Sequence, residues 1–130
     1  MMLQKNITNQ TVDIADPIDT FTTFPLALVV QPDLKLYELL ADLSPDKSWG
    51  VRKTAAQKLG DMRNSEALPS LLHALLVDPF WMVRCAIIEA LEKIGDTSAI
   101  TILQKVAESD SFQVVRSYAA KAIERLSPVA

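Results

Sequence analysis

Apolar and polar positions along most of the chain recur with the spacing of α-helices. Residues 83–94 show this most clearly. At about 100° per residue, their Val, Ala, Ile and Leu side chains gather on one face, with Cys85, Glu89 and Glu92 opposite. The same spacing predicts six helices, at residues 34–43, 47–59, 66–77, 79–94, 98–108 and 111–126.

Local signals mark the expected ends of these helices. Asp78 followed by Pro79 is typical of an N-cap with proline at the first helical position, where a missing N–H costs nothing. Gly60 and Gly95 fall just beyond apolar runs, where helices commonly end in a left-handed residue. Ser65 is the expected cap of the helix that follows Gly60. Short turns therefore join the helices.

The helical pattern is also an internal repeat. "VRKTAAQKL" begins at Val51, "VRCAIIEAL" at Val83 and "VRSYAAKAI" at Val115, so the copies lie 32 residues apart. A second helix lies between consecutive copies, which gives each repeat two helices. Residues 33–43 align with the second helix of this unit, so we expect the array to begin with half a repeat.

Charged residues recur in the same register. Three arginines lie at the edge of the apolar faces, and an aspartate precedes each of them by six residues. An isolated arginine there would be costly, so we predict a structural ladder of paired charges between neighbouring repeats, with contact to a ligand as the alternative. The ladder residues are Asp46, Arg52, Asp78, Arg84, Asp110 and Arg116.

In each repeat an aspartate is followed by Val-Arg and an alanine-rich helix, and then by Ala-Leu or Ala-Ile on a second helix. This pattern resembles the short HEAT-type repeat of phycobiliprotein lyases. The resemblance covers residues 33–127. It implies an all-α fold, an α-solenoid of about three HEAT-like helical hairpins with a 32-residue period. It also implies that the aspartate of each turn lies near the arginines of stacked repeats.

Composition restricts the partners and the location. The 130 residues are 49% hydrophobic and 22% charged, enough for one domain with a core. A net charge of -3 removes the broad attraction to phosphate backbones, so we expect no nucleic acid partner. Outside the helices the longest apolar run, residues 24–30, falls short of the roughly 20 residues that span a bilayer. One cysteine and no secretory signal indicate a cytoplasmic protein.

Candidate chemistry is sparse. Cys85 occupies the position of Lys53 and Ser117 in the other repeats and is predicted to face solvent; a reactive thiol there would need a lowered pKa. His73 is the only histidine, so one His and one Cys cannot supply a usual zinc site. Phosphate loops and nucleophile motifs are absent from the sequence. We expect no metal, no cofactor and no enzyme activity.

Large side chains gather where the first helices of the repeats begin. Because solenoid turns stack along one edge, they could form an aromatic ridge that binds a partner, with Trp49 and Trp81 the expected exposed pair. The alternative is that they fill gaps between hairpins. The ridge residues are Trp49, Phe80, Trp81, Met82 and Phe112.

The exposed side of the second helices is the other candidate surface. The resemblance implies that this side lines a concave groove, and its mixed polarity suits a protein or peptide better than a polyanion. The candidate partner-binding residues there are Tyr37, His73 and Lys105, and Glu38, Ser70, Ile102 and Val106 are also expected to point outward.

The two ends of the chain differ from the repeats. Residues 1–32 lack the Asp-Val-Arg register, and we expect either a cap over the first repeat or a flexible arm ahead of a repeat domain at 33–130. At the other end, Tyr118, Ile123 and Leu126 are either buried in the last hairpin or packed on another molecule, so a homodimer through this end is a further hypothesis.

Two functions follow from these features. The favoured one is a non-enzymatic scaffold or adaptor that binds a partner protein through the groove or the ridge. The alternative, implied by the resemblance alone, is an accessory subunit of a phycobilin lyase or a phycobilisome-associated factor.

Overall fold

The computed structural model describes residues 33–128. The chain divides into two units, Met1–Asp33 and Leu34–Ala130, and all the described helices lie in the second unit. The hypotheses of a cap or an arm at residues 1–32 lie outside the described residues. Among the helices described, none is long and apolar enough to cross a membrane.

The described residues form six α-helices and two short 3-10 turns, with no strand among them, which confirms the predicted all-α fold. Each 3-10 turn leads directly into the α-helix after it. The helices are α1 (Leu34–Ala41), α2 (Trp49–Met62), α3 (Leu68–Val77), α4 (Trp81–Ile94), α5 (Ile100–Ser109) and α6 (Gln113–Leu126), and the 3-10 turns are η5 (Ser65–Ala67) and η6 (Thr97–Ala99).

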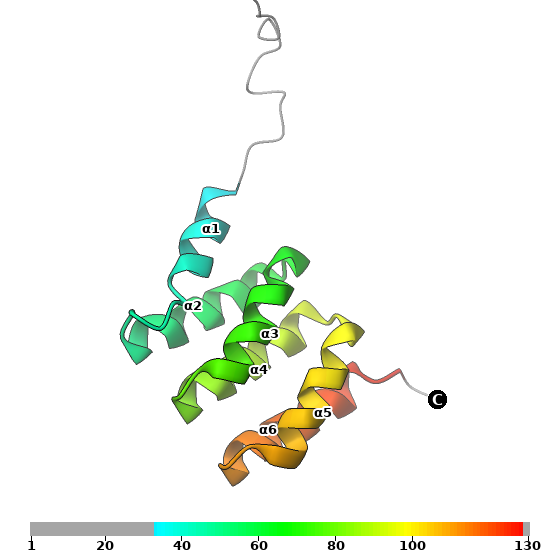
Figure 1. The fold of residues 1–130 in the computed structure, drawn as a ribbon. Coiled ribbons are helices and arrows are strands. Elements are labelled where there is room, and N and C mark those ends of the chain that lie inside the picture. Colours follow the sequence, from blue (N-terminus) through cyan, green and yellow to red (C-terminus); the bar gives the residue numbers. More distant parts are fainter. Residues whose placement is uncertain (1–32, 129–130) are drawn as a thin grey trace, which may run out of the picture. The chain divides into compact units, whose positions relative to one another are not determined.

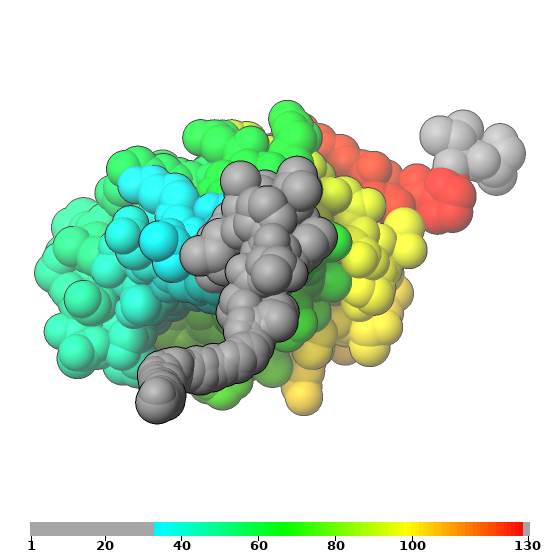
Figure 2. All heavy atoms as spheres, turned by 90° about the horizontal axis from the view of Figure 1, so that it is seen from above, coloured from blue at the N-terminus to red at the C-terminus, as the bar shows by residue number. Residues whose placement is uncertain are grey.

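The helices lie in two layers, with α2, α4 and α6 in one and α1, α3 and α5 in the other (Figure 1). Within the first layer α4 packs against both α2 and α6. The helices of the second layer do not pack closely on one another; each packs on the helix that follows it in sequence. In Figure 2 the colours run in chain order from cyan on one side of the molecule, through green and yellow, to red on the other.

This pairing corrects the predicted half repeat at the start of the array. The closely packed hairpins are α1 with α2, α3 with α4, and α5 with α6, so three whole hairpins are present. The reason is the position of the aspartate turn, which joins the two helices of one hairpin rather than two repeats. The family resemblance correctly implied about three hairpins.

Helices α4 and α6 begin two residues later than predicted, because the aspartates act in the turn rather than as N-caps. Asp78 Oδ1 accepts a hydrogen bond from the Phe80 amide at 2.9 Å, and Asp110 Oδ1 accepts one from the Phe112 amide at 2.9 Å. This is the local turn that aspartate side chains favour. Phe80 and Phe112 then occupy the N-cap positions without a side-chain cap.

Gly60 does not end its helix, contrary to the prediction. Helix α2 continues to Met62 and ends at Arg63, which is in the left-handed conformation with φ 53°. Gly60 lies instead at a tight contact between α2 and α4: a Cβ built on it would be 2.7 Å from the Cα of Ala90. The prediction for Gly95 is confirmed, since it ends α4 with φ 77°.

The first 3-10 turn is capped one residue earlier than expected. The side chain of Asn64, not of Ser65, accepts a hydrogen bond from the Glu66 amide at 2.9 Å. Asp96 accepts in the same way from the Ser98 amide, also at 2.9 Å. These polar caps satisfy amide groups that the helix starts leave without partners.

Candidate binding surfaces

Arginine–aspartate pairs link successive hairpins at two places. Arg52 donates from Nε to Asp78 Oδ2 at 2.7 Å and from Nη2 to Oδ1 at 3.1 Å. Arg84 makes the same two bonds to Asp110, at 2.7 and 2.9 Å. Both pairs are largely shielded from solvent, with side chains no more than 11% exposed. Such two-bond pairs fix orientation as well as supplying energy.

Each arginine also bonds the turn of its own hairpin through its remaining nitrogen. Arg52 Nη1 donates to the Lys47 carbonyl at 2.6 Å, and Arg84 Nη1 donates to the Asp78 carbonyl at 3.0 Å. Arg116 Nη1 donates to the Asp110 carbonyl at 2.6 Å. Arg52 and Arg84 therefore each hold their own turn and the aspartate of the next hairpin at once. This geometry supports the structural interpretation of the ladder over contact with a ligand.

The ladder stops at its two ends. Asp46 is exposed, and a hydrogen bond with Ser44 lowers the pKa of its carboxyl. Arg116 bonds the Asp110 carbonyl and, among the described residues, has no carboxylate partner. The predicted ladder is thus present as two pairs; among the described residues, Asp46 is not paired with an arginine and Arg116 is not paired with a carboxylate.

Electrostatics within the pairs favour the charged forms. The hydrogen bond with Asp78 raises the pKa of Arg52. Burial alone would raise the pKa of Asp110, but the bonds from Arg84 and the Phe112 amide, with the charges of nearby arginines, outweigh burial and lower it. The carboxylate of Asp110 is therefore ionised at neutral pH.

The predicted ridge residues form two aromatic pairs across successive hairpins. Trp49 contacts Phe80 with ring centroids 4.8 Å apart, and Trp81 stacks on Phe112 at 5.9 Å. The guanidinium of Arg84 lies 5.8 Å from the centroid of the Phe112 ring. Phe80 and Trp81 pack against the core, which supports the alternative that these side chains fill gaps between hairpins.

The exposed pair of the ridge differs from the prediction. Trp49 is 44% exposed and Phe112 46%, whereas Trp81 and Met82 are half-buried. The prediction that Trp81 is exposed is wrong, because the following hairpin covers it through Phe112. Only the two ends of the ridge therefore offer much aromatic surface to a partner.

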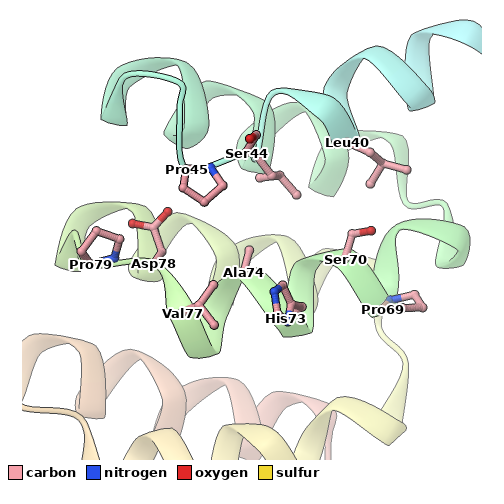
Figure 3. Close-up of a pocket in the computed structure, with 11 residues that line it drawn as sticks. Leu40, Ser44, Pro45, Pro69, Ser70, His73, Ala74, Val77, Asp78 and Pro79 are labelled. Atoms are coloured by element: carbon pink, nitrogen blue, oxygen red, sulfur yellow. The ribbon is translucent and has the colours of Figure 1, made fainter.

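Two of the candidate residues of the second helices, His73 and Lys105, lie at two different clefts. The first opens between the α1–α2 hairpin and α3, has a volume of about 390 Å³ and is mostly apolar (Figure 3). Exposed His73 lies at this cleft, and half-buried Ser70 beside it. Its apolar lining comes from Leu40, Leu43, Pro45, Pro69, Ala74, Val77 and Pro79.

The second cleft, between α3 and α5, is more polar and has a volume of about 500 Å³. Lys105 is exposed at its edge, and Leu76, 49% exposed, lies in it. Val106 also lines it but is only 6% exposed, so the prediction that Val106 points outward is wrong; it belongs to the core face of α5. Tyr37 is 53% exposed on α1, away from both clefts.

The prediction that Cys85 faces solvent is also wrong, because this residue is buried. Its exposed fraction is 7%, since α4 lies between α2 and α6 and is covered on both sides. Burial, with the charge of Glu89, raises the pKa of the thiol to about 11. A thiol that stays protonated at neutral pH is a poor nucleophile. The burial of Cys85 and its raised pKa therefore argue against the reactive-thiol interpretation.

Two ion pairs near the C-terminal ends of α2, α4 and α6 were not predicted from the sequence. Lys93 Nζ lies 2.7 Å from Asp61 Oδ1, and Arg125 Nη1 lies 2.9 Å from Glu92 Oε2. The signal that could have found them is spacing: the partners lie 32 and 33 residues apart, about one period. They are partly or fully exposed, so each contributes little stability on its own.

The C-terminal hairpin buries part of its own apolar surface. Leu126 is 9% exposed and Ile123 packs against the core, while Tyr118 is 36% exposed. Among the described residues, no group of three or more His, Cys, Asp or Glu side chains could hold a metal ion.

Comparison with known proteins agrees with this architecture. Residues 36–124 match the family of HEAT repeats, and the chain belongs to that family. HEAT repeats are generally protein-interaction scaffolds and are usually non-enzymatic. No curated protein matches the chain.

Proposed function

We propose that this protein is a non-enzymatic scaffold or adaptor that binds a short segment of a partner protein in the cleft between the α1–α2 hairpin and α3. The observation that carries the proposal is the cleft itself, an apolar hollow between helices that do not pack closely on each other. The family's general role as interaction scaffolds supports it. The cytoplasmic location expected from the single cysteine is part of the same proposal.

The size and lining of the cleft indicate the kind of ligand it takes. A volume of about 390 Å³ accommodates a few apolar side chains rather than a whole helix. Leu40, Pro45 and Val77 offer apolar contacts, and Ser70 and His73 offer hydrogen bonds that fix the direction of a bound backbone (Figure 3). Protein binding sites commonly combine an apolar surface with a few such polar groups.

The rigidity of the cleft walls favours binding. Three prolines line it, and their fixed φ angles limit the freedom of the surrounding backbone. A preformed site loses less conformational entropy when a ligand enters. The exposed ends of the aromatic ridge, Trp49 and Phe112, are a second candidate contact for the same partner.

Two neighbouring residues of α3 give a matched test. Val77, 53% exposed, lines the proposed cleft, and Leu76, 49% exposed, lines the more polar one. The full chain and the variants Val77→Arg and Leu76→Arg would be used in affinity capture from the native cell extract, read by mass spectrometry. We expect a stoichiometric protein to be lost with Val77→Arg and kept with Leu76→Arg.

Equal capture by both variants would show that the cleft does not bind the partner. A third variant, Trp49→Ala, reports separately on the ridge. Bilin or a phycobiliprotein in the eluate would instead support the accessory role in bilin attachment that the family resemblance implied.

A further inference from the structure

The contacts between hairpins recur with the 32-residue period, so among the described residues 33–128 the first and the last hairpin each present one half of a contact. In the interior, an arginine at the start of one hairpin's second helix bonds an aspartate 26 residues later, in the turn of the next hairpin. Helix α6 has no following hairpin among the described residues. Its surface therefore carries the donor half of this contact without the acceptor.

The unfilled donor is the guanidinium of Arg116. Its Nη1 donates to the Asp110 carbonyl at 2.6 Å, as Nη1 of Arg84 donates to the Asp78 carbonyl at 3.0 Å. The side chain is thus held in the same way in both hairpins. In Arg84, Nε and Nη2 are bonded to a carboxylate; in Arg116, these two groups have no partner among the described residues.

The unfilled acceptor lies at the opposite end of the array. Asp46 shares the register of Asp78 and Asp110, one period before the first of them. Its carboxyl is exposed and is not paired with an arginine among the described residues. A second copy of the chain, continuing the stack beyond α6, would bring its Asp46 to Arg116.

Two other contact positions give the same match of charge. In the interior, Gly60 of α2 lies against Ala90 of α4 with no room for a Cβ. At the junction between copies these positions hold Glu124 and Lys58, both exposed and of opposite charge, so the two helices there lie farther apart than α2 and α4 do. The positions of Asp61 and Lys93 correspond at the junction to Arg125 of one copy and Asp61 of the next. Within its own copy Arg125 already bonds Glu92 and Asp61 already bonds Lys93, so this contact would join two existing ion pairs. All three positions thus bring opposite charges together.

We propose that copies of this chain associate head to tail, with the α6 face of one copy on the α2 face of the next and Arg116 bonding Asp46 through Nε and Nη2. The contact joins two different faces, so it does not close on itself and leads to open stacks rather than to a dimer. Charge complementarity in the register of the interior contacts selects a second copy as the occupant. This surface is distinct from the cleft beside α3.

Sedimentation velocity of the full chain over a range of concentrations tests this proposal. We expect the average mass to rise with concentration beyond that of a dimer, and the association to weaken in high salt. Asp46→Arg and Arg116→Asp should each lower the association constant about tenfold or more, as removal of a close charge pair at an interface does. The double variant Asp46→Arg/Arg116→Asp restores the pair in reverse and should recover most of the association.

Controls separate this contact from general effects. Glu108→Arg makes the same charge reversal on an exposed part of α5 and should leave association unchanged. Arg116→Asp also loses a bond to the Asp110 carbonyl, so each variant's thermal melt is recorded; Asp46→Arg, at an exposed site, does not have this problem. A wild-type chain that stays monomeric, a mass that stops at the dimer, or a double variant no better than the single ones would overturn the proposal.

Discussion

Substitution of two glycines in α2 by alanine should change stability in opposite directions. Gly50 and Gly60 lie in the same helix, but a Cβ at position 50 meets nothing within 4 Å, whereas a Cβ at position 60 would lie 2.7 Å from the Cα of Ala90 and 3.0 Å from its Cβ. The nearest obstacle to Gly60→Ala is therefore backbone of α4, which cannot rotate away.

The magnitudes follow from this difference. Alanine in place of glycine in a helix stabilises by about 0.5–1 kcal/mol, so Gly50→Ala should raise the free energy of unfolding by that amount. Gly60→Ala gains the same but forces α2 and α4 apart, and overpacking of this kind costs about 1–3 kcal/mol. Because the clash is with backbone, we expect a net loss of about 1–2 kcal/mol at position 60.

Urea unfolding followed by circular dichroism measures both changes on the same scale. The variants should shift the midpoint in opposite directions without a large change in the slope. If Gly60→Ala is as stable as Gly50→Ala, α2 and α4 do not approach each other as described, and the stacking of the first two hairpins is wrong.

Three further predictions concern the charged pairs and the thiol. Arg52→Met should lower the free energy of unfolding by about 3–5 kcal/mol, because it leaves Asp78 buried without its partner. The double variant Arg52→Met/Asp78→Leu should recover much of that loss in the same urea assay. If the losses of the two single variants simply add in the double variant, the two residues are not paired. Folding lowers the pKa of Asp110, so the stability that this carboxylate contributes is present above its unfolded pKa and is lost as the pH falls through the folded pKa. Asp110→Asn should therefore flatten the acid side of a plot of unfolding free energy against pH. An unchanged acid side would contradict this role of Asp110. Cys85 should react slowly with iodoacetamide at pH 7 and fast in denaturant, as followed by mass spectrometry; equal rates would mean that the thiol is exposed.

The contacts between repeats could be predicted because the period makes equivalent residues occupy equivalent places. Once the valine–arginine copies were aligned, three aspartates in one register had to lie near three arginines, and the structure forms a pair wherever both neighbours exist. The same periodicity explains why Asp46 and Arg116 remain without a pair among the described residues. Repetition, rather than any single residue, carried this information.

The burial of Cys85 on α4 could not be predicted from the repeat. A projection of one helix identifies its most apolar face but assumes a single neighbour. Helix α4 has neighbours in the first layer on both sides, so Cys85 is buried although it lies opposite the apolar face. At the equivalent positions of the outer hairpins, Lys53 is half-buried and Ser117 is exposed. Comparison with these two residues therefore led to the wrong prediction for Cys85.

The cleft beside α3 also depends on information that periodicity does not contain. It opens between the α1–α2 hairpin and α3, so its lining depends on how successive hairpins are stacked. Sequence patterns placed His73 on the exposed side of α3, but the prolines that form the walls, Pro45 and Pro69, were not singled out. Turn residues of this kind gain their role only when the hairpins are stacked.

Direct contact between the partner and this cleft is the central claim, and site-specific photo-crosslinking in cells tests it most directly. A photoreactive amino acid would replace exposed His73 at the cleft in one chain and exposed Lys121 on α6 in another. Our account predicts one discrete crosslinked protein from position 73 and none of that mass from position 121. Identical products from both positions, or none from position 73, would contradict it.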